Sequence, residues 1–239
     1  MLKSSIYLHY VTLQLGAMNL RVISLFEDLP DRALARVESL CSMRSYKKGE
    51  EIVGDHENTT DVFFILTGTV RVTSFTEAGR EVIFNDVSGG AIFGEFSAID
   101  RLPRSASGVA LTDCSLARMP ASHFSGLLRE ENSVAVHLIE LLVRKIRPMS
   151  DRLFEISALA VRERLRRELL RLATMSGKKE GSVIVIVPAP THYEIAARIG
   201  SHREAVTREV NRLELEKVLE IGRRSIRIID LERLKETEE

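Results

Sequence analysis

The sequence predicts an α+β protein in which a small β barrel or sandwich is followed by a run of helices. Three observations support this prediction. Between residues 45 and 119, short apolar runs alternate with glycine-marked turns, as in a compact antiparallel β domain. Residues 130–157 repeat apolar side chains three and four positions apart, which is typical of a long amphipathic helix. Beyond residue 158, the pattern indicates shorter helices and one hairpin.

Composition favours an ordinary globular chain. Its 239 residues are 44% hydrophobic and 28% charged, enough for two domains of moderate size. The net charge is zero, but residues 158–239 hold 17 Lys and Arg against 14 Asp and Glu. This excess is too small to indicate nucleic-acid binding without a suitable placement of the arginines. The only cysteines, Cys41 and Cys114, lie far apart, which favours a reducing compartment.

The first residues do not form a recognisable targeting segment. His9 and Gln14 interrupt the apolar letters there, no cleavage site follows, and no later run reaches the eighteen or so apolar residues of a membrane span. We therefore expect a cytoplasmic protein that makes no contact with a membrane. The predicted organisation is an N-terminal extension (1–20), a β domain (21–129), a long helix (130–157) and a C-terminal domain (158–239).

The elements of the predicted β domain can be placed in order. Residues 25–40 are expected to form a short helix outside the barrel. Alternating apolar and polar side chains at 62–66, 70–75 and 81–84 predict strands.

The predicted long helix carries an apolar stripe with the spacing of a coiled-coil seam. Such a stripe favours pairing with a second copy of the chain, and the alternative is a helix that lies on the barrel. Pro148, inside this helix, predicts a kink next to Met149. The stripe consists of Ile139, Leu142, Ile146, Met149, Leu153, Ile156 and Ala160.

The C-terminal domain is predicted to begin with a helix over residues 161–175, a polar loop over 176–181 and a strand over 183–187. Two helix starts then follow ten residues apart. Thr191 with Glu194, and Ser201 with Glu204, each have the spacing of a capping box. Gly200 supplies the turn between the two helices. Apolar side chains are expected to fill the face between them.

This arrangement predicts a helix-turn-helix. The first turns of its second helix leave Arg203, Glu204, Thr207 and Arg208 pointing outward, where they can read bases in a major groove. A hairpin over residues 219–229 has a basic tip, as in a wing beside DNA phosphates. In the alternative, the helices pack against protein. The candidate DNA-binding residues are Thr191, Ser201, His202, Arg203, Glu204, Thr207, Arg208, Arg223 and Arg224.

A second candidate site lies in the β domain. Gly94 is expected to begin a helical turn whose free N–H groups favour an anion, and Arg104 and Ser105 add a positive charge and a hydroxyl. Glu95 suits a ribose hydroxyl and repels a second phosphate. These residue types predict a site for a ribose joined to one phosphate. In the alternative, Glu95 and Arg104 pair only with each other.

The segments Phe93–Glu95 and Arg104–Ala106 resemble the phosphate-binding cassette of cyclic-nucleotide-binding domains. From about residue 25 to 229, the chain resembles the catabolite activator (CRP/FNR) superfamily, with its β roll (a jelly roll), dimerisation helix and winged helix-turn-helix. The resemblance implies that Glu95 binds the ribose and that Arg104 and Ser105 bind the cyclic phosphate. The ligand-binding residues that it implies are Gly94, Glu95, Phe96, Arg104, Ser105, Ala106, Met149 and Ser150.

The resemblance also implies that Arg203, Glu204 and Arg208 read a TGTGA-type half-site. Two departures from the family pattern qualify this comparison. Met149-Ser150 stands where cAMP-binding members carry Thr-Ser, so the effector is expected to be cAMP or cGMP. Ala160 replaces the Asp that caps the helix after the hinge in many relatives. An iron–sulfur cluster is not expected, because the N-terminal half before the cassette holds only Cys41.

We therefore expect a homodimeric transcription regulator that binds pseudo-palindromic double-stranded DNA in response to a cyclic nucleotide, with RNA polymerase as a further partner. No catalytic or metal-binding residues and no cofactor are expected, and no P-loop or catalytic triad is visible. One alternative is a regulator of the same architecture that responds to another effector or to none. A weaker alternative is a nucleotide-dependent enzyme.

Overall fold

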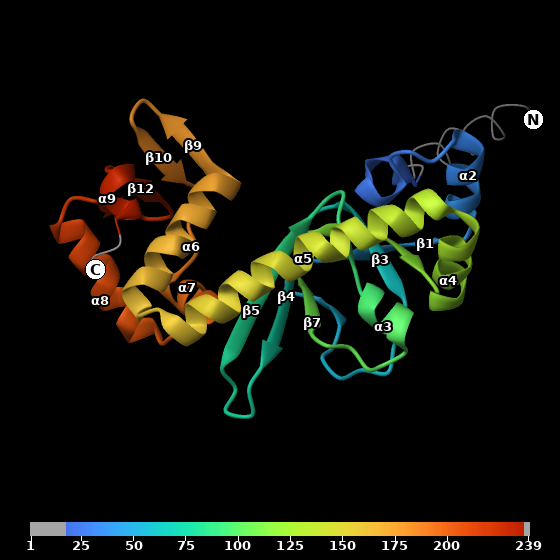
Figure 1. The fold of residues 1–239 in the computed structure, drawn as a ribbon, viewed down its shortest axis with the longest axis horizontal. Coiled ribbons are helices and arrows are strands. Elements are labelled where there is room, and N and C mark those ends of the chain that lie inside the picture. The colour runs from blue at the N-terminus through green and yellow to red at the C-terminus, as the bar shows by residue number, and fades with distance from the viewer. Residues whose placement is uncertain (1–17, 237–239) are drawn as a thin grey trace, which may run out of the picture. The chain divides into compact units, whose positions relative to one another are not determined.

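The computed structural model describes residues 18–236, and these form two compact units (Figure 1). The first unit contains residues 18–74 and 84–142, and the second contains residues 75–83 and 143–236. The expected N-terminal extension lies almost wholly outside the described residues. Within residues 18–236, every helix is too short or too polar to cross a membrane.

The first unit is built around a β roll of two four-stranded sheets whose orders are β1-β8-β3-β6 and β2-β7-β4-β5. The ladders of β8 with β1 and β3, of β3 with β6, and of β7 with β2 and β4 are all antiparallel. The predicted β domain is therefore confirmed. The strands are β1 (Ser42–Tyr46), β2 (Glu51–Val53), β3 (Val62–Thr67), β4 (Thr69–Phe75), β5 (Glu81–Ser88), β6 (Ile92–Phe93), β7 (Ser107–Ala110) and β8 (Cys114–Met119).

Aromatic rings occupy the core of this unit. Phe63 and Phe93 stack with ring centroids 5.0 Å apart, and Phe26 packs on Phe64 at the same distance. Because alternate side chains of β3 face opposite sides of its sheet, neighbouring phenylalanines serve two separate apolar clusters. The cluster that contains Phe64 also takes in the short helices around the roll, which fixes them to it.

One of those helices, α2, is shorter than the sequence predicts. The expected helix over residues 25–40 is wrong at its start, because α2 begins at Asp31 with Pro30 as its N-cap. The residue before a proline is disfavoured in helical conformation, which separates α2 from the 3₁₀ turn ahead of it. The helices of this region are η1 (Leu20–Val22), η2 (Ser24–Phe26), α2 (Asp31–Ser39), α3 (Glu95–Asp100) and α4 (Ala121–Glu130).

The long helix α5 (Asn132–Ala158) agrees with the predicted bounds and continues through Pro148. The next helix, α6 (Val161–Ser176), follows after a break of two residues. Ala160 is its N-cap and has no side-chain oxygen to accept a hydrogen bond, so only half of a capping box forms, from the Ala160 N–H to Glu163 Oε2 at 2.8 Å.

The second unit joins these helices to a four-stranded antiparallel sheet with the order β11-β12-β10-β9. The predicted polar loop over residues 176–181 is wrong, because residues 177–180 form β9 against β10. The elements after α6 are β9 (Gly177–Glu180), β10 (Val183–Ile186), α7 (His192–Ile199), α8 (Arg203–Leu215), β11 (Leu219–Ile221), β12 (Ile226–Ile228) and α9 (Leu231–Lys235).

The apolar face predicted between the two short helices is confirmed. The predicted side chains of α7 and α8 are all buried, together with Leu165 and Leu169 of α6. Helices α6, α7 and α8 therefore share one core. The predicted residues in it are Ile195, Ala196, Ile199, Val206, Val210 and Leu213.

Candidate functional site

Gly94 is the turning point of the candidate ligand site. It is the N-cap of α3 and has a left-handed backbone with φ of +82°. A Cβ at this position would lie 2.7 Å from Arg104 Nη1 and 2.8 Å from the carbonyl oxygen of Asp61. Both the backbone conformation and the close approach of Arg104 require glycine here.

Arg104 packs directly beneath this glycine and is only 3% exposed. Its guanidinium donates three hydrogen bonds, from Nε to Thr59 Oγ1 at 2.9 Å, from Nη1 to the Gly94 carbonyl at 3.0 Å and from Nη2 to the Asp61 carbonyl at 2.9 Å. The guanidinium also lies over the Phe63 ring, with Cζ 5.9 Å from the centroid. The cation is thus held inside the roll by polar partners and one aromatic face.

Burial has an electrostatic cost for this cation. Desolvation lowers the pKa of Arg104, and the charges of Asp61, Glu57 and Glu95 oppose that shift. Arginine nevertheless stays protonated at physiological pH. The site therefore contains a permanent positive charge in a partly dehydrated setting, where an anion is attracted more strongly than in water.

Glu95 completes the buried pair of charges in the cassette. It is the first residue of α3 and is only 3% exposed. Its charge is close enough to Arg104 to influence the arginine pKa. The structure therefore brings Gly94, Glu95 and Arg104 together in one unit.

The other cassette residues lie nearer the surface. The Phe96 and Ser105 side chains are exposed, and Ala106 is half-buried. Met149 and Ser150 are exposed on α5, where Ser150 Oγ donates to the Ile146 carbonyl at 3.2 Å. Their contact with a ligand base stays a prediction.

Sequence reasoning did not identify Thr59 and Asp61 as part of this site. Both precede β3, more than forty positions before Arg104. Neither belongs to a motif, and Asp61 contributes a backbone oxygen that any residue could supply. Only the fold, which places the segment after β2 against Arg104, shows their role.

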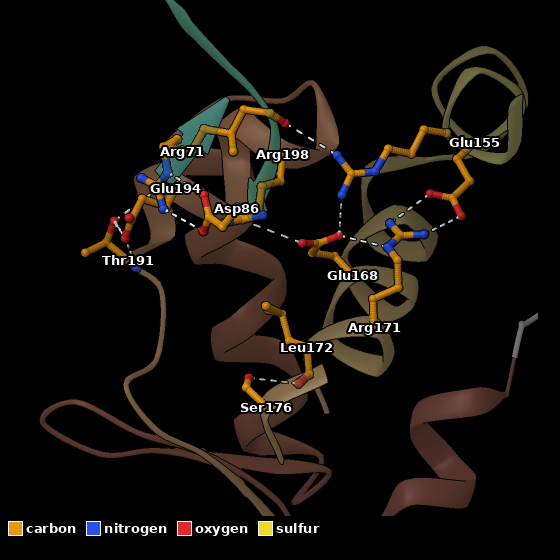
Figure 2. Close-up of polar contacts among 12 residues, drawn as sticks. Arg71, Asp86, Glu155, Glu168, Arg171, Leu172, Ser176, Thr191, Glu194 and Arg198 are labelled. Atoms are coloured by element: carbon orange, nitrogen blue, oxygen red, sulfur yellow. Dashed lines mark hydrogen bonds and ion pairs between the residues drawn. The ribbon is translucent and has the colours of Figure 1, made fainter. Parts of the chain in front are cut away.

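The first helix of the predicted helix-turn-helix has the cap that the sequence indicates. Thr191 Oγ1 accepts from the Glu194 N–H at 3.2 Å, and the Thr191 N–H donates to Glu194 Oε2 at 2.8 Å (Figure 2). Gly200 ends α7 with φ of +62°, as expected of the turn residue. Arg164 supports this turn, because its Nη1 donates to the Ile199 carbonyl at 2.7 Å. Arg164 is a second residue that sequence reasoning did not identify.

The second predicted capping box is wrong. His202, not Ser201, is the N-cap of α8, and no side-chain hydrogen bond caps that helix. Ser201 is instead buried, and its N–H donates to the Ala196 carbonyl at 3.0 Å, which extends the turn that leaves α7. The two segments have the same local pattern. In the second, however, Ser201 belongs to the tight turn after Gly200, and α8 begins only at Arg203.

Helix α8 presents the expected charged face. Arg203, Glu204 and Arg208 are all exposed on its first two turns. The hydroxyl of Thr207 is used inside the protein, because it donates to the Arg203 carbonyl at 2.9 Å and lies 2.9 Å from His192 Nδ1. The contact between Thr207 and His192 ties α8 to α7.

The predicted wing is present as the hairpin of β11 and β12. Its tip closes through a hydrogen bond from the Gly222 N–H to the Ser225 carbonyl at 2.8 Å. Arg223 and Arg224 lie at this tip and are exposed. The second unit therefore offers two cationic surfaces, one on the first turns of α8 and one on the wing.

The first unit also contains a group of acidic and histidine side chains and a thiol with a shifted pKa. Among the described residues, Glu27, Asp28 and His137 form a group with potential metal ligands, in which Asp28 Oδ2 lies 3.2 Å from His137 Nε2. Two of the three are exposed, and such groups are common without a metal. Burial, reinforced by the charge of Glu38, raises the pKa of Cys41 to about 12, so its thiolate form is rare at neutral pH.

Both units resemble known protein domains. The sequence profile of the cyclic nucleotide-binding domain matches residues 43–131, and that of the Crp-like helix-turn-helix domain matches residues 163–237. The chain is 30% identical over 199 residues to the transcriptional regulator SdrP of Thermus thermophilus, and the match covers 82% of this chain and 93% of that protein.

Two further relatives show the range of the similarity. The CRP-like cAMP-activated global transcriptional regulator of Mycobacterium tuberculosis is 23% identical over 88% of this chain and 94% of its own length. The structure of the c-di-GMP responsive global regulator CLP of Xanthomonas campestris superimposes with a TM-score of 0.74 at 16% identity, and the match covers 83% of this chain and 99% of that one. Together with the buried cassette and the helix-turn-helix, these matches show that the chain belongs to the CRP/FNR family of transcription regulators and carries that family's cyclic nucleotide-binding domain.

Proposed function

We propose that this protein is a homodimeric transcription regulator whose affinity for its operator changes when cAMP or cGMP binds in the β roll. The observation that supports this proposal best is the burial of Glu95 and Arg104 next to Gly94. A buried carboxylate accepts hydrogen bonds from sugar hydroxyls, and a buried guanidinium binds a phosphate through paired N–H groups.

The charges of this site favour a ligand with one phosphate. Arg104 supplies one cation, and the neighbouring Glu95 would repel a second phosphate group. A cyclic mononucleotide carries a single negative charge and one ribose, which suits this pair. The principal alternative is a regulator of the same architecture with another effector, since the names of the relatives include both cAMP-activated and c-di-GMP responsive proteins.

Selectivity between the two nucleotides is proposed to depend on Met149 and Ser150. Methionine cannot donate a hydrogen bond to an adenine or guanine edge, whereas the serine hydroxyl can both donate and accept. We therefore expect a modest difference in affinity between cAMP and cGMP. The Met149→Thr variant should move the preference toward cAMP, and an unchanged preference would show that position 149 does not contact the base.

The proposed DNA contacts follow from the exposed faces of the second unit. Arg203, Glu204 and Arg208 are proposed to read base edges in the major groove of a TGTGA-type half-site. Arg223 and Arg224 are proposed to contact phosphates. A twofold dimer reads two half-sites whose centres lie about 10–10.5 base pairs apart.

The proposed dimer forms through α5. Its seam positions Ile139, Ile146 and Leu153 are all exposed in the single chain, and Leu153 reaches 69% exposure. Such a stripe of large apolar side chains is typical of a helix that pairs with a second copy. The same proposal includes a cytoplasmic location, contact with RNA polymerase and no enzymatic activity.

A titration with and without DNA tests the proposal. Calorimetry with cAMP and with cGMP measures binding to the dimer, and fluorescence anisotropy with a palindromic TGTGA duplex measures whether either nucleotide changes operator affinity. The Arg104→Leu variant should retain the fold and lose nucleotide binding. Equal operator affinity with and without either nucleotide would contradict the proposed response, and hydrolysis of the nucleotide would indicate the enzyme alternative.

A further inference from the structure

The loop that joins β2 to β3, residues 54–61, lies against Arg104 along its length. Two backbone hydrogen bonds fix the loop to the arginine, from the His56 N–H to the Arg104 carbonyl and from the Arg104 N–H to the Glu57 carbonyl, both at 2.9 Å. The side chain is then held by Thr59 Oγ1 and the Asp61 carbonyl, also at 2.9 Å each. This loop, which we call the clamp loop, contributes four of the five hydrogen bonds described for Arg104.

The clamp loop and Gly94 together use three of the N–H donors of the guanidinium. A guanidinium has five N–H groups, one on Nε and two on each terminal nitrogen. Thr59 takes the Nε donor, the Asp61 carbonyl takes one on Nη2, and the Gly94 carbonyl takes one on Nη1. One N–H therefore remains on each terminal nitrogen, and two such N–H groups can bind two oxygens of a phosphate in bidentate fashion.

The carboxylate of Asp61 does not compete with such a ligand. It is turned away to Arg118, with Oδ2 2.7 Å from Nη2, so that Asp61 offers Arg104 only its backbone oxygen. The three hydrogen bonds that orient the Arg104 guanidinium thus all go to neutral acceptors. Thr59 is the only side chain of the clamp loop with a hydrogen bond to the guanidinium among the described residues.

We propose that Thr59 is a positioning residue for nucleotide binding, which acts by holding the Arg104 guanidinium with its two remaining terminal N–H groups toward the phosphate. This inference rests on the proposed binding of a cyclic nucleotide in the β roll. The bond to Nε prevents rotation of the guanidinium about its Cδ–Nε bond. Without it, only the Gly94 and Asp61 carbonyls orient the guanidinium, so the group keeps more rotational freedom that it must lose when the phosphate binds, and the affinity falls accordingly.

The experiment compares Thr59→Val with Thr59→Ser in the full-length protein, with cAMP as the probe. Valine keeps the shape of threonine and removes the acceptor, and serine keeps the oxygen. We expect Thr59→Val to weaken cAMP affinity about tenfold, the order of one hydrogen bond to a charged group. Thr59→Ser should restore affinity to within about threefold of the original protein. Thr60→Val, a change of the same type at the adjacent position, should leave affinity unchanged.

A double-mutant cycle separates positioning from a general effect on the fold. Lysine at position 104 has no Nε–H for Thr59 to bind, so Thr59→Val should cause no further loss of affinity in an Arg104→Lys background. An equal tenfold loss in both backgrounds would overturn the inference. Unchanged cAMP affinity in Thr59→Val alone would also overturn it while leaving the proposed function intact. Failure of the original protein to bind either cAMP or cGMP would overturn both.

Discussion

Arg171 binds Glu155 with both terminal nitrogens of its guanidinium, Nη1 to Oε1 at 2.8 Å and Nη2 to Oε2 at 3.0 Å (Figure 2). Its Nε donates in addition to Glu168 Oε2 at 2.9 Å. Burial alone would lower the pKa of Arg171, but its hydrogen bonds to the two glutamates and their charges raise it above the usual value. Because Glu155 is on α5 and Arg171 is on α6, this pair joins the two helices across the break between them.

Glu168 is the most deeply buried member of this group, at 2% exposure. Arg152 Nη2 lies 3.7 Å and Arg198 Nε 3.9 Å from its carboxylate, so three arginines share one anion. Glu168→Gln should therefore lower the free energy of unfolding by about 3 kcal/mol, because these partly buried arginines lose their shared, buried counter-charge. Urea unfolding monitored by circular dichroism measures the change.

The control for this prediction is the same substitution at an exposed ion pair. Glu232 Oε1 lies 2.7 Å from Lys235 Nζ, and both side chains are more than half exposed. Exposed pairs of this kind contribute little to stability, so Glu232→Gln should leave the unfolding midpoint almost unchanged. Equal midpoints for the two variants would show that the cluster around Glu168 does not stabilise the second unit.

The elements of this fold that follow from local signals were predictable. The period of α5, the cap at Thr191 and the glycine turn at Gly200 each depend on residues close in sequence. The strand β9 did not follow, because Lys178 and Lys179 have no strand preference of their own. They become a strand only because Gly181, with φ of +65°, turns the chain so that residues 177–180 pair with β10.

The candidate site also combines features that follow from local sequence with features that depend on distant segments. The cassette residues from Gly94 to Ala106 form a local motif, and the buried pair of Glu95 and Arg104 was predictable as a pair of opposite charges. The clamp loop was not, because its contacts with Arg104 arise from tertiary structure between distant segments. The cluster of Glu155, Glu168 and Arg171 was missed for a different reason, since charged residues at helical spacing are normally solvated.

Gly94→Ala should disrupt the cassette. The new methyl group would meet Arg104 Nη1 and the Asp61 carbonyl at less than 3 Å, on a backbone whose positive φ already disfavours alanine. We expect a loss of about 1–3 kcal/mol in stability, the usual range for strain at such positions, together with loss of cAMP binding. Thermal unfolding and calorimetry measure the two effects.

The control for Gly94→Ala is the same substitution at Gly126 in α4. No atom lies within 4 Å of a Cβ built there, and its backbone is helical. Alanine is favoured over glycine inside a helix, so the free energy of unfolding of this variant should rise by roughly 0.5–1 kcal/mol. Its affinity for cAMP should be unchanged. Retention of stability and nucleotide affinity in Gly94→Ala would contradict the packing of Arg104 against this glycine.

Arg203→Ala and Arg223→Ala should affect DNA binding in different ways. The first removes a proposed base contact on α8, so preference at one guanine should fall by ~1–3 kcal/mol. The second removes a charge from the wing tip, so affinity should fall for all sequences and the dependence on salt should become shallower by about one unit of slope. Anisotropy titrations with operator variants at several salt concentrations separate these outcomes. Identical profiles for the two variants would contradict the assigned roles.

Leu153→Asp should convert the proposed dimer into a monomer. Leu153 is the most exposed apolar side chain of the α5 stripe. Burying one leucine contributes ~1.5–3 kcal/mol, so losing one from each copy should weaken association by roughly a hundredfold or more. The two introduced carboxylates would also repel each other. Arg147→Asp adds the same carboxylate to α5 outside the predicted seam and should leave the dimer intact. Sedimentation equilibrium measures both variants, and a monomeric original protein, or equal association of the two variants, would show that the stripe does not form the dimer interface.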